Sequence, residues 1–166
     1  MGKGRRALVV VAVLLMLSLV GFAQDDGVNL SSGRSFGVGV TLSSPPMLTG
    51  IWCVSDQMCL ELMAGYMSGV IMATGSLQYR MLDGAAFDVL PYLEAGYWGV
   101  SIVGYTFGGP IVGAGAIAEY SLSKSIVVRG NVGVTYIAAD FGGISLYDAF
   151  GFSYGLSLHY YFGTQE

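Results

Sequence analysis

The sequence predicts an all-β fold: an eight-stranded antiparallel up-and-down transmembrane β-barrel preceded by a cleaved signal peptide. The segment 152–162 alternates apolar residues with small or polar ones over eleven positions. This period of two defines a strand, and roughly 9 to 11 residues let a tilted strand cross a bilayer. Six ionisable residues within the apparent strands fall on the polar parity, as in a barrel that turns its apolar side to lipid. The apolar residues of the closing strand are Tyr154, Leu156, Leu158, Tyr160 and Phe162.

The N-terminus has the three parts of a secretory signal peptide. Basic residues at Lys3, Arg5 and Arg6 precede an apolar run, and small residues stand before Gln24. An uncleaved membrane anchor is the alternative, but the polar residues after Ala23 favour cleavage. The expected organisation is therefore a signal peptide at 1–23, a periplasmic tail at 24–33, the barrel at 34–162 and a C-terminal tail at 163–166.

The composition of the predicted mature chain excludes several partners. Cleavage after residue 23 leaves four basic residues against eleven acidic ones, a net charge of −7. Such a charge suits neither nucleic acid nor an anionic inner leaflet. The length supports one domain, and no Pro-, Ser- or charge-rich linker divides it.

The first four predicted strands alternate in the same way and end at turn-forming residues. The first stops at the Ser-Ser-Pro-Pro run 43–46, and residues 55–57 form a tight turn between the second and third. In the fourth strand, Leu77 and Tyr79 oppose Gln78. These strands are expected at 34–42, 47–54, 58–67 and 73–82.

The second half of the chain continues the pattern after a turn at 83–89. A strand rich in small residues follows a Gly-rich loop, and Ile126 and Val128 oppose Arg129 in the strand after it. These strands are expected at 90–100, 111–120, 125–136 and 152–162. An even number of strands returns both termini to the same side, as entry from the periplasm requires. The outer loops are then expected at 43–46, 67–72, 101–110 and 137–149, and the periplasmic turns at 55–57, 83–89 and 121–124.

Six ionisable residues within the strands predict a charged interior. Every Asp of the mature chain falls in a predicted tail, turn or loop, whereas these six lie on the parity opposite the apolar residues. All six lie towards the periplasmic ends of their strands, so we expect one interior cluster in which the charges pair, because isolated charges there would be costly. An eight-stranded barrel is just wide enough for side chains to fill it, which predicts a plugged interior. The six are Glu61, Arg80, Glu94, Glu119, Arg129 and His159.

Two cysteines flank the second turn symmetrically. A three-residue loop places Cys53 directly across from Cys59, and an oxidising periplasm permits a disulfide between them. Two free inward thiols are the alternative. A metal site that includes His159 is a third reading, although the cysteine spacing matches no common zinc site. No cofactor is expected.

Four stretches of the chain resemble the family of small eight-stranded outer-membrane barrels, the OmpA-like transmembrane domain and its single-domain relatives. They are Ile51 to Leu62, Pro91 to Tyr97, Glu119 to Lys124 continuing into Val128-Arg129-Gly130, and the closing aromatic strand. The resemblance implies a place in the bacterial outer membrane, contact with its lipids, and a closing strand that the barrel assembly machinery reads. In the family a final Phe commonly ends the chain, whereas four residues follow Phe162 here.

Two other folds compete with this barrel. Segments 62–79 and 95–118 contain no charged residue, so a hydropathy window would nominate two helices of an inner-membrane protein. Against this, the second segment is rich in Gly and contains Pro110. A soluble lipocalin-like barrel would have to bury the charged face and expose the apolar one.

The leading functional hypothesis is a non-enzymatic structural or surface component of the outer membrane, with no small-molecule substrate and no nucleic acid. A lipid-modifying enzyme is the alternative, because Ser157 and His159 share a face and Glu61 or Glu119 could orient the imidazole. A narrow channel is the third reading.

Overall fold

In the computed structural model the chain is an all-β barrel. The structure describes residues 33–43, 45–84, 86–102, 105–141 and 144–162, so the predicted signal peptide and almost all of both predicted tails lie outside the described residues. Within these ranges the strands are β1 (Phe36–Leu42), β2 (Met47–Cys53), β3 (Met58–Met67), β4 (Val70–Tyr79), β5 (Leu82–Asp83), β6 (Phe87–Ile102), β7 (Tyr105–Ser121), β8 (Ile126–Phe141) and β9 (Ile144–Phe162).

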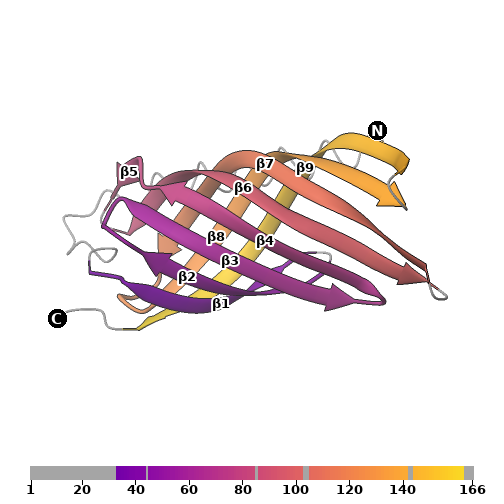
Figure 1. Cartoon of the computed structure of the whole chain (residues 1–166). Coiled ribbons are helices and arrows are strands. Elements are labelled where there is room, and N and C mark those ends of the chain that lie inside the picture. Colours follow the sequence, from indigo (N-terminus) through magenta and orange to yellow (C-terminus); the bar gives the residue numbers. More distant parts are fainter. Residues whose placement is uncertain (1–32, 44, 85, 103–104, 142–143, 163–166) are drawn as a thin grey trace, which may run out of the picture.

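Antiparallel pairing closes the sheet into a ring. The strand order is β4-β3-β2-β1-β9-β8-β7-β6-β5, and a further pairing of β4 with β6 joins the two ends. Eight strands form the wall, while β5 adds only two residues beside the start of β6. Figure 1 shows the strands inclined around a common axis. The predicted eight-stranded antiparallel barrel is therefore confirmed.

The strand ends differ from expectation mainly in the second half of the chain. The expected loops 101–110 and 137–149 are largely strand, because β6 pairs with β7 as far as Ile102 and Tyr105, and β8 pairs with β9 as far as Phe141 and Ile144. The glycines of 101–110 suggested a loop because Gly has a low strand propensity, but cross-strand hydrogen bonding stabilises the strands despite that propensity. In the first half, β4 begins at Val70 instead of residue 73.

The helical alternative is wrong for both of the segments that suggested it. Residues 62–79 belong to β3 and β4 with their turn, residues 95–102 belong to β6, and residues 105–118 belong to β7. Within the described residues, no helix combines the length and the apolar character needed to cross a membrane.

Burial alternates along the strands with the polarity predicted for an outward-facing apolar wall. In β2, Thr49, Ile51 and Cys53 are buried, whereas Leu48 and Trp52 are exposed. The interior of the barrel also holds buried charged residues, which are described below. This arrangement is the reverse of the polarity that a soluble barrel requires, so the lipocalin-like reading fails.

Large interior side chains lie opposite glycines of the neighbouring strand. His159 pairs in register with Gly39, and Glu94 pairs with Gly113. A Cβ added at Gly39 would overlap the His159 ring and come within 2.5 Å of the Leu158 carbonyl oxygen. Glycine therefore provides the volume that the imidazole occupies in a barrel of this narrow bore.

We expect Gly39→Ala to lower the free energy of unfolding by about 1–3 kcal/mol, the usual cost of overpacking a filled interior. The matched control is Gly50→Ala in β2, where an added Cβ meets nothing within 4 Å and the change should stay within about 0.5 kcal/mol. Urea titration of the chain folded in phospholipid vesicles measures both. Equal effects of the two substitutions would contradict the packing argument.

Candidate functional site in the barrel interior

Three arginines and three acids meet in the interior of the barrel. Each of the six residues is at most 7% exposed, and together they are termed the ion cluster. Their formal charges balance, which satisfies the requirement that buried charges be paired. The ion cluster consists of Arg34 before β1, Glu61 in β3, Arg80 after β4, Asp88 in β6, Glu119 in β7 and Arg129 in β8.

Arg129 bridges two carboxylates through two different nitrogens. Its Nη1 lies 3.2 Å from Glu61 Oε2, and its Nε lies 3.2 Å from Glu119 Oε2. Its Nη2 donates to the amide oxygen of Gln78, and the amide nitrogen of Gln78 donates to Glu61 Oε2 and, at 3.0 Å, to Ser76 Oγ. One guanidinium therefore links β3, β4, β7 and β8 across the lumen.

Arg34 connects the start of the barrel to the turn between β7 and β8. Its Nη1 donates to Glu119 Oε1 at 2.8 Å, and its Nε donates to the Lys124 carbonyl at 3.0 Å. Its Nη2 donates to Ser121 Oγ and to the Ser123 carbonyl at 3.0 and 3.1 Å. The guanidinium also lies 5.0 Å above the centre of the Tyr161 ring, a cation–π contact. Arg34 thus supplies hydrogen-bond donors to the carbonyl oxygens of Ser123 and Lys124 in this turn.

Arg80 links two turns at the same end of the barrel. Its Nε lies 3.3 Å from Asp88 Oδ2, and its Nη2 lies 3.8 Å from Glu119 Oε1. Its Nη1 donates to the carbonyl oxygen of Asp56 in the turn between β2 and β3. Asp88 in turn accepts a hydrogen bond from the Gly84 amide at 3.1 Å.

His159 contacts the ion cluster through a single ring nitrogen. Its Nε2 lies 2.6 Å from Thr49 Oγ1 and 3.4 Å from Glu61 Oε1. An acyl-transfer triad needs the orienting carboxylate on one ring nitrogen and the nucleophile on the other. Here the carboxylate and a hydroxyl share Nε2, and no hydrogen bond among the described residues joins Ser157 to His159.

The structure brings five of the six residues proposed from the sequence into contact with one another and leaves one apart. Glu94 accepts a hydrogen bond from Thr135 Oγ1 at 3.1 Å, and none of the ion pairs formed within the described ranges includes it. In register, Ser76 lies between Glu61 and Glu94, which places the two carboxylate-bearing positions about 10 Å apart across three strands. The three arginines of the ion cluster are matched by three closer acids, so none of them pairs with Glu94.

Two members of the ion cluster are not among the interior residues that the sequence predicts. Asp88 was assigned to a turn along with the other Asp residues, but it lies in β6 and is fully buried. It shares the parity of Leu90, Tyr92 and Glu94, so extending the predicted strand by two residues would have found it. Arg34 gave no such signal, because it shares the parity of the outward-facing Phe36 and lies before β1, where alternation no longer applies.

A disulfide joins Cys53 to Cys59 across the turn between β2 and β3. The two residues are opposite in register and pack with Ile51, Val127 and Tyr161 in a buried apolar group. Sulfurs bonded to each other do not act as thiolate ligands, and no group of three or more metal-ligating side chains occurs in the part of the chain that the structure describes.

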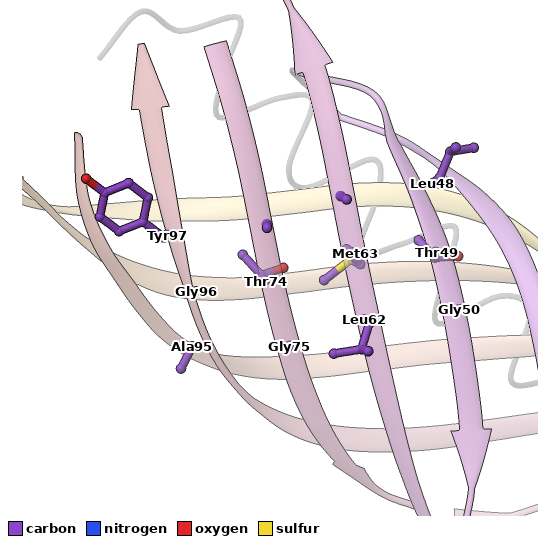
Figure 2. Close-up of a pocket in the computed structure, with 12 residues that line it drawn as sticks. Leu48, Thr49, Gly50, Leu62, Met63, Thr74, Gly75, Ala95, Gly96 and Tyr97 are labelled. Atoms are coloured by element: carbon purple, nitrogen blue, oxygen red, sulfur yellow. The ribbon is translucent and has the colours of Figure 1, made fainter. Parts of the chain in front are cut away.

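A separate hollow of about 650 Å³ lies in the wall formed by β2, β3, β4 and β6. In Figure 2, Gly50 of β2, Leu62 of β3, Gly75 of β4 and Ala95 of β6 form a row across the four strands, with Tyr97 farther along β6. No member of the ion cluster lines this hollow, although its lining includes Thr49 and Thr74, which are buried.

These features define a class of protein: a small closed antiparallel β-barrel with an apolar outer wall and a charge-paired interior. The chain matches no protein-family model and no curated protein. Among solved structures it is similar to the N-terminal β-barrel domain of Pseudomonas aeruginosa OprF, with 14% identity and a TM-score of 0.48 over 76% of this chain and 95% of that one. So remote a likeness says nothing about function, and the barrel rests on the strand pairing of the chain itself.

Removing the guanidinium of Arg129 should destabilise the barrel. We expect Arg129→Met to lower the free energy of unfolding by about 3–5 kcal/mol, because it leaves Glu61 and Glu119 buried without their shared cation. Adding Glu61→Gln should recover part of the loss, with a coupling energy of about 0.5–3 kcal/mol in a double-mutant cycle. Glu94→Gln is the control and should cost less than about 1 kcal/mol, since an amide oxygen still accepts from Thr135. Additive effects of the first two substitutions would refute the bridging role.

The disulfide should resist reduction while the barrel is folded, because both cysteines are buried. We expect dithiothreitol to expose no maleimide-reactive thiol in the folded chain, and to expose two after denaturation. The double substitution of Cys53→Ser with Cys59→Ser should cost about 2 kcal/mol, the value for a short closed loop. Rapid labelling of the folded chain would show that this end of the barrel opens.

Proposed function

We propose that the chain is a non-catalytic β-barrel of the bacterial outer membrane with a structural or surface role. The observation that carries the proposal is the reversed polarity of the barrel. Phe152, Trp52 and Leu93 are well exposed on the outer wall, while three arginines and three acids are buried inside. Soluble monomers rarely expose apolar patches of such extent, whereas a wall facing acyl chains must be apolar.

The route to that membrane is part of the proposal. A cleaved signal peptide at 1–23 would deliver the chain to the periplasm, and strand pairing around the closed barrel satisfies backbone groups without water wherever neighbouring strands run side by side. The outward-facing residues of the closing strand from Tyr154 to Phe162 fit the role of an assembly signal read by the barrel assembly machinery. The predicted partners are therefore this machinery during insertion and the outer-membrane lipids afterwards.

The filled interior supports a structural role over a channel or an enzyme. Side chains from β3, β4, β7 and β8 meet around Arg129, which obstructs the lumen with ion-paired groups. The imidazole of His159 is held by Thr49 and Glu61 through the same nitrogen, which leaves Ser157 without the general base that a nucleophile needs.

Two leucines of similar exposure test whether lipid surrounds the wall. Leu93 lies within β6 and is 65% exposed, and Leu122 follows β7 in a turn and is 58% exposed. In vesicles we expect Leu93→Arg to lower the free energy of unfolding by about 2–4 kcal/mol and Leu122→Arg by about 0–1 kcal/mol, because the cost of a charge on the lipid face depends on depth. Two near-zero effects would remove the membrane assignment.

Measurements of conductance and of lipid acyl turnover test the structural role. Planar bilayers containing the folded chain should show no discrete conductance steps, and His159→Ala should leave phospholipid and lipid A acyl turnover unchanged. Regular conductance steps would favour a channel. Acyl turnover that disappears with His159→Ala would favour an enzyme.

A further inference from the structure

The chain supplies no cation to the carboxylate of Glu94 in β6. Outside the predicted signal peptide the sequence has four basic residues, and three of them are the arginines of the ion cluster, where each meets an acid. The fourth, Lys124, lies in the turn that follows β7. Glu94 pairs in register with Gly113, well inside that strand. A counter-ion for this carboxylate must therefore come from outside the chain.

The carboxylate belongs to a row of inward-facing residues that leaves space beyond it. Thr135 Oγ1 donates to Glu94 Oε1 at 3.1 Å, and a Cβ added at Gly113 would lie 2.5 Å from the same oxygen. The row continues from Thr135 to Gly151 of β9, where an added Cβ would meet nothing within 4 Å. Gly151 is exposed and Glu94 is only partly buried. The lumen is therefore open beside this carboxylate, in contrast to the obstructed region around Arg129.

A neighbouring row, on the side of the ion cluster, supplies two neutral hydroxyls. Tyr92 precedes Glu94 by two residues on the same face of β6 and is buried. Its ring passes over glycines of β7 and β8, since a Cβ added at Gly115 would lie 2.7 Å from Tyr92 Cε1 and one at Gly133 would overlap the hydroxyl. The hydroxyl oxygen lies 3.5 Å from Ser153 Oγ of β9, which is long for a hydrogen bond between hydroxyls. Both oxygens can therefore accept from a further donor.

A buried hydroxyl borders the carboxylate on its other side. Thr74 of β4 is 6% exposed, and its Oγ1 has no hydrogen-bond partner within the described residues. Thr74 pairs in register with Gly96, two residues beyond Glu94 on the same face of β6, and glycine places no side chain between them. Figure 2 shows Thr74 beside Gly96. Because an unsatisfied buried hydroxyl is costly, Thr74 is a second indication, independent of charge, that this part of the lumen takes a ligand.

We propose that this part of the lumen binds the primary ammonium group of a small molecule. An ammonium group carries one positive charge and three N–H donors, which match the carboxylate of Glu94 and the hydroxyls of Tyr92 and Ser153. The two rows are two residues apart along each strand, about 7 Å, so one nitrogen can lie about 3 Å from acceptors in both rows. Thr74, on the far side of Glu94, is placed to hydrogen-bond a second polar group of the same molecule.

A metal ion or a quaternary ammonium fits these groups less well. Calcium takes about six to eight oxygen ligands, commonly with several carboxylates among them, whereas Glu94 is the single carboxylate of these two rows. No group of three or more metal-ligating side chains occurs in the described ranges. A quaternary ammonium carries the same charge as a primary one but has no N–H to donate to the hydroxyls. These two differences supply the comparison ligands for the test.

Titration of methylammonium chloride into the full chain, folded in detergent micelles, tests the site. We expect the NMR amide signals of Thr135 and Gly151 to shift saturably in the millimolar range, as suits so small a probe. Glu94→Gln should weaken binding at least about tenfold, because it removes the charge from the acceptor. The matched control is Asp148→Asn, which removes one negative charge from an exposed position that Tyr136 contacts and should change the affinity less than about twofold.

A second set of measurements separates hydrogen bonding from charge alone. Tetramethylammonium should bind at least about tenfold more weakly than methylammonium, and Tyr92→Phe, which keeps the ring, should weaken methylammonium binding about two- to tenfold. Heat-modifiable gel mobility first verifies that each variant is a folded barrel. Equal affinity of Glu94→Gln and the parent chain, equal binding of the two ammonium ions, or displacement of methylammonium by an equal concentration of calcium would overturn the inference. Those outcomes leave the membrane assignment intact, because the site is measured in detergent and that assignment is tested by the arginine substitutions at Leu93 and Leu122.

Discussion

The interior depends on one guanidinium shared between two carboxylates. Arg129 lies within 3.2 Å of both Glu61 and Glu119, and the latter also accepts from Arg34. Each carboxylate would be intolerable alone in a medium of low dielectric, so the four groups are mutually dependent. These four groups come from β3, β7, β8 and the segment before β1. The network therefore joins the N-terminal and C-terminal halves of the barrel across the lumen, which strand pairing alone would leave hollow.

Glycine and charge play complementary parts in this narrow barrel. Where an interior side chain is large, as at His159, the neighbouring strand places Gly39 opposite it. Where the interior is ionic, the arginines reach past the strand ends to the carbonyls of the turns, as Arg34 does at Lys124 and Arg80 does at Asp56. The guanidinium groups of these arginines therefore both fill the lumen and hydrogen-bond the turns. The uneven height of the wall has a different origin, because β1 and β2 end at the turn around Pro45 and Pro46 while β8 and β9 continue.

Much of the barrel was predictable because alternation is a local property. The inward placement of Glu61 and Arg129 follows from the parity of their immediate neighbours, and the disulfide position follows from the symmetry of a three-residue turn. Strand ends were less predictable in the glycine-rich second half, because pairing with a neighbouring strand, and not propensity, decides where β6 to β9 end. The contacts of Glu94 could not be foreseen, since parity states which face a side chain occupies and not which cation is within reach.

The sequence by itself determined the polarity of the wall: a period of two, with apolar residues on one parity and charges on the other, specifies which groups face outward in any barrel. Only the tertiary structure decided which charges meet. Arg34 and Glu119 are 85 residues apart, and their contact exists because closure of the ring brings the start of β1 beside the turn between β7 and β8. It also decided that β9 extends beyond its last pairing with β1, since the relative height of two strands depends on their register and has no signature within either segment.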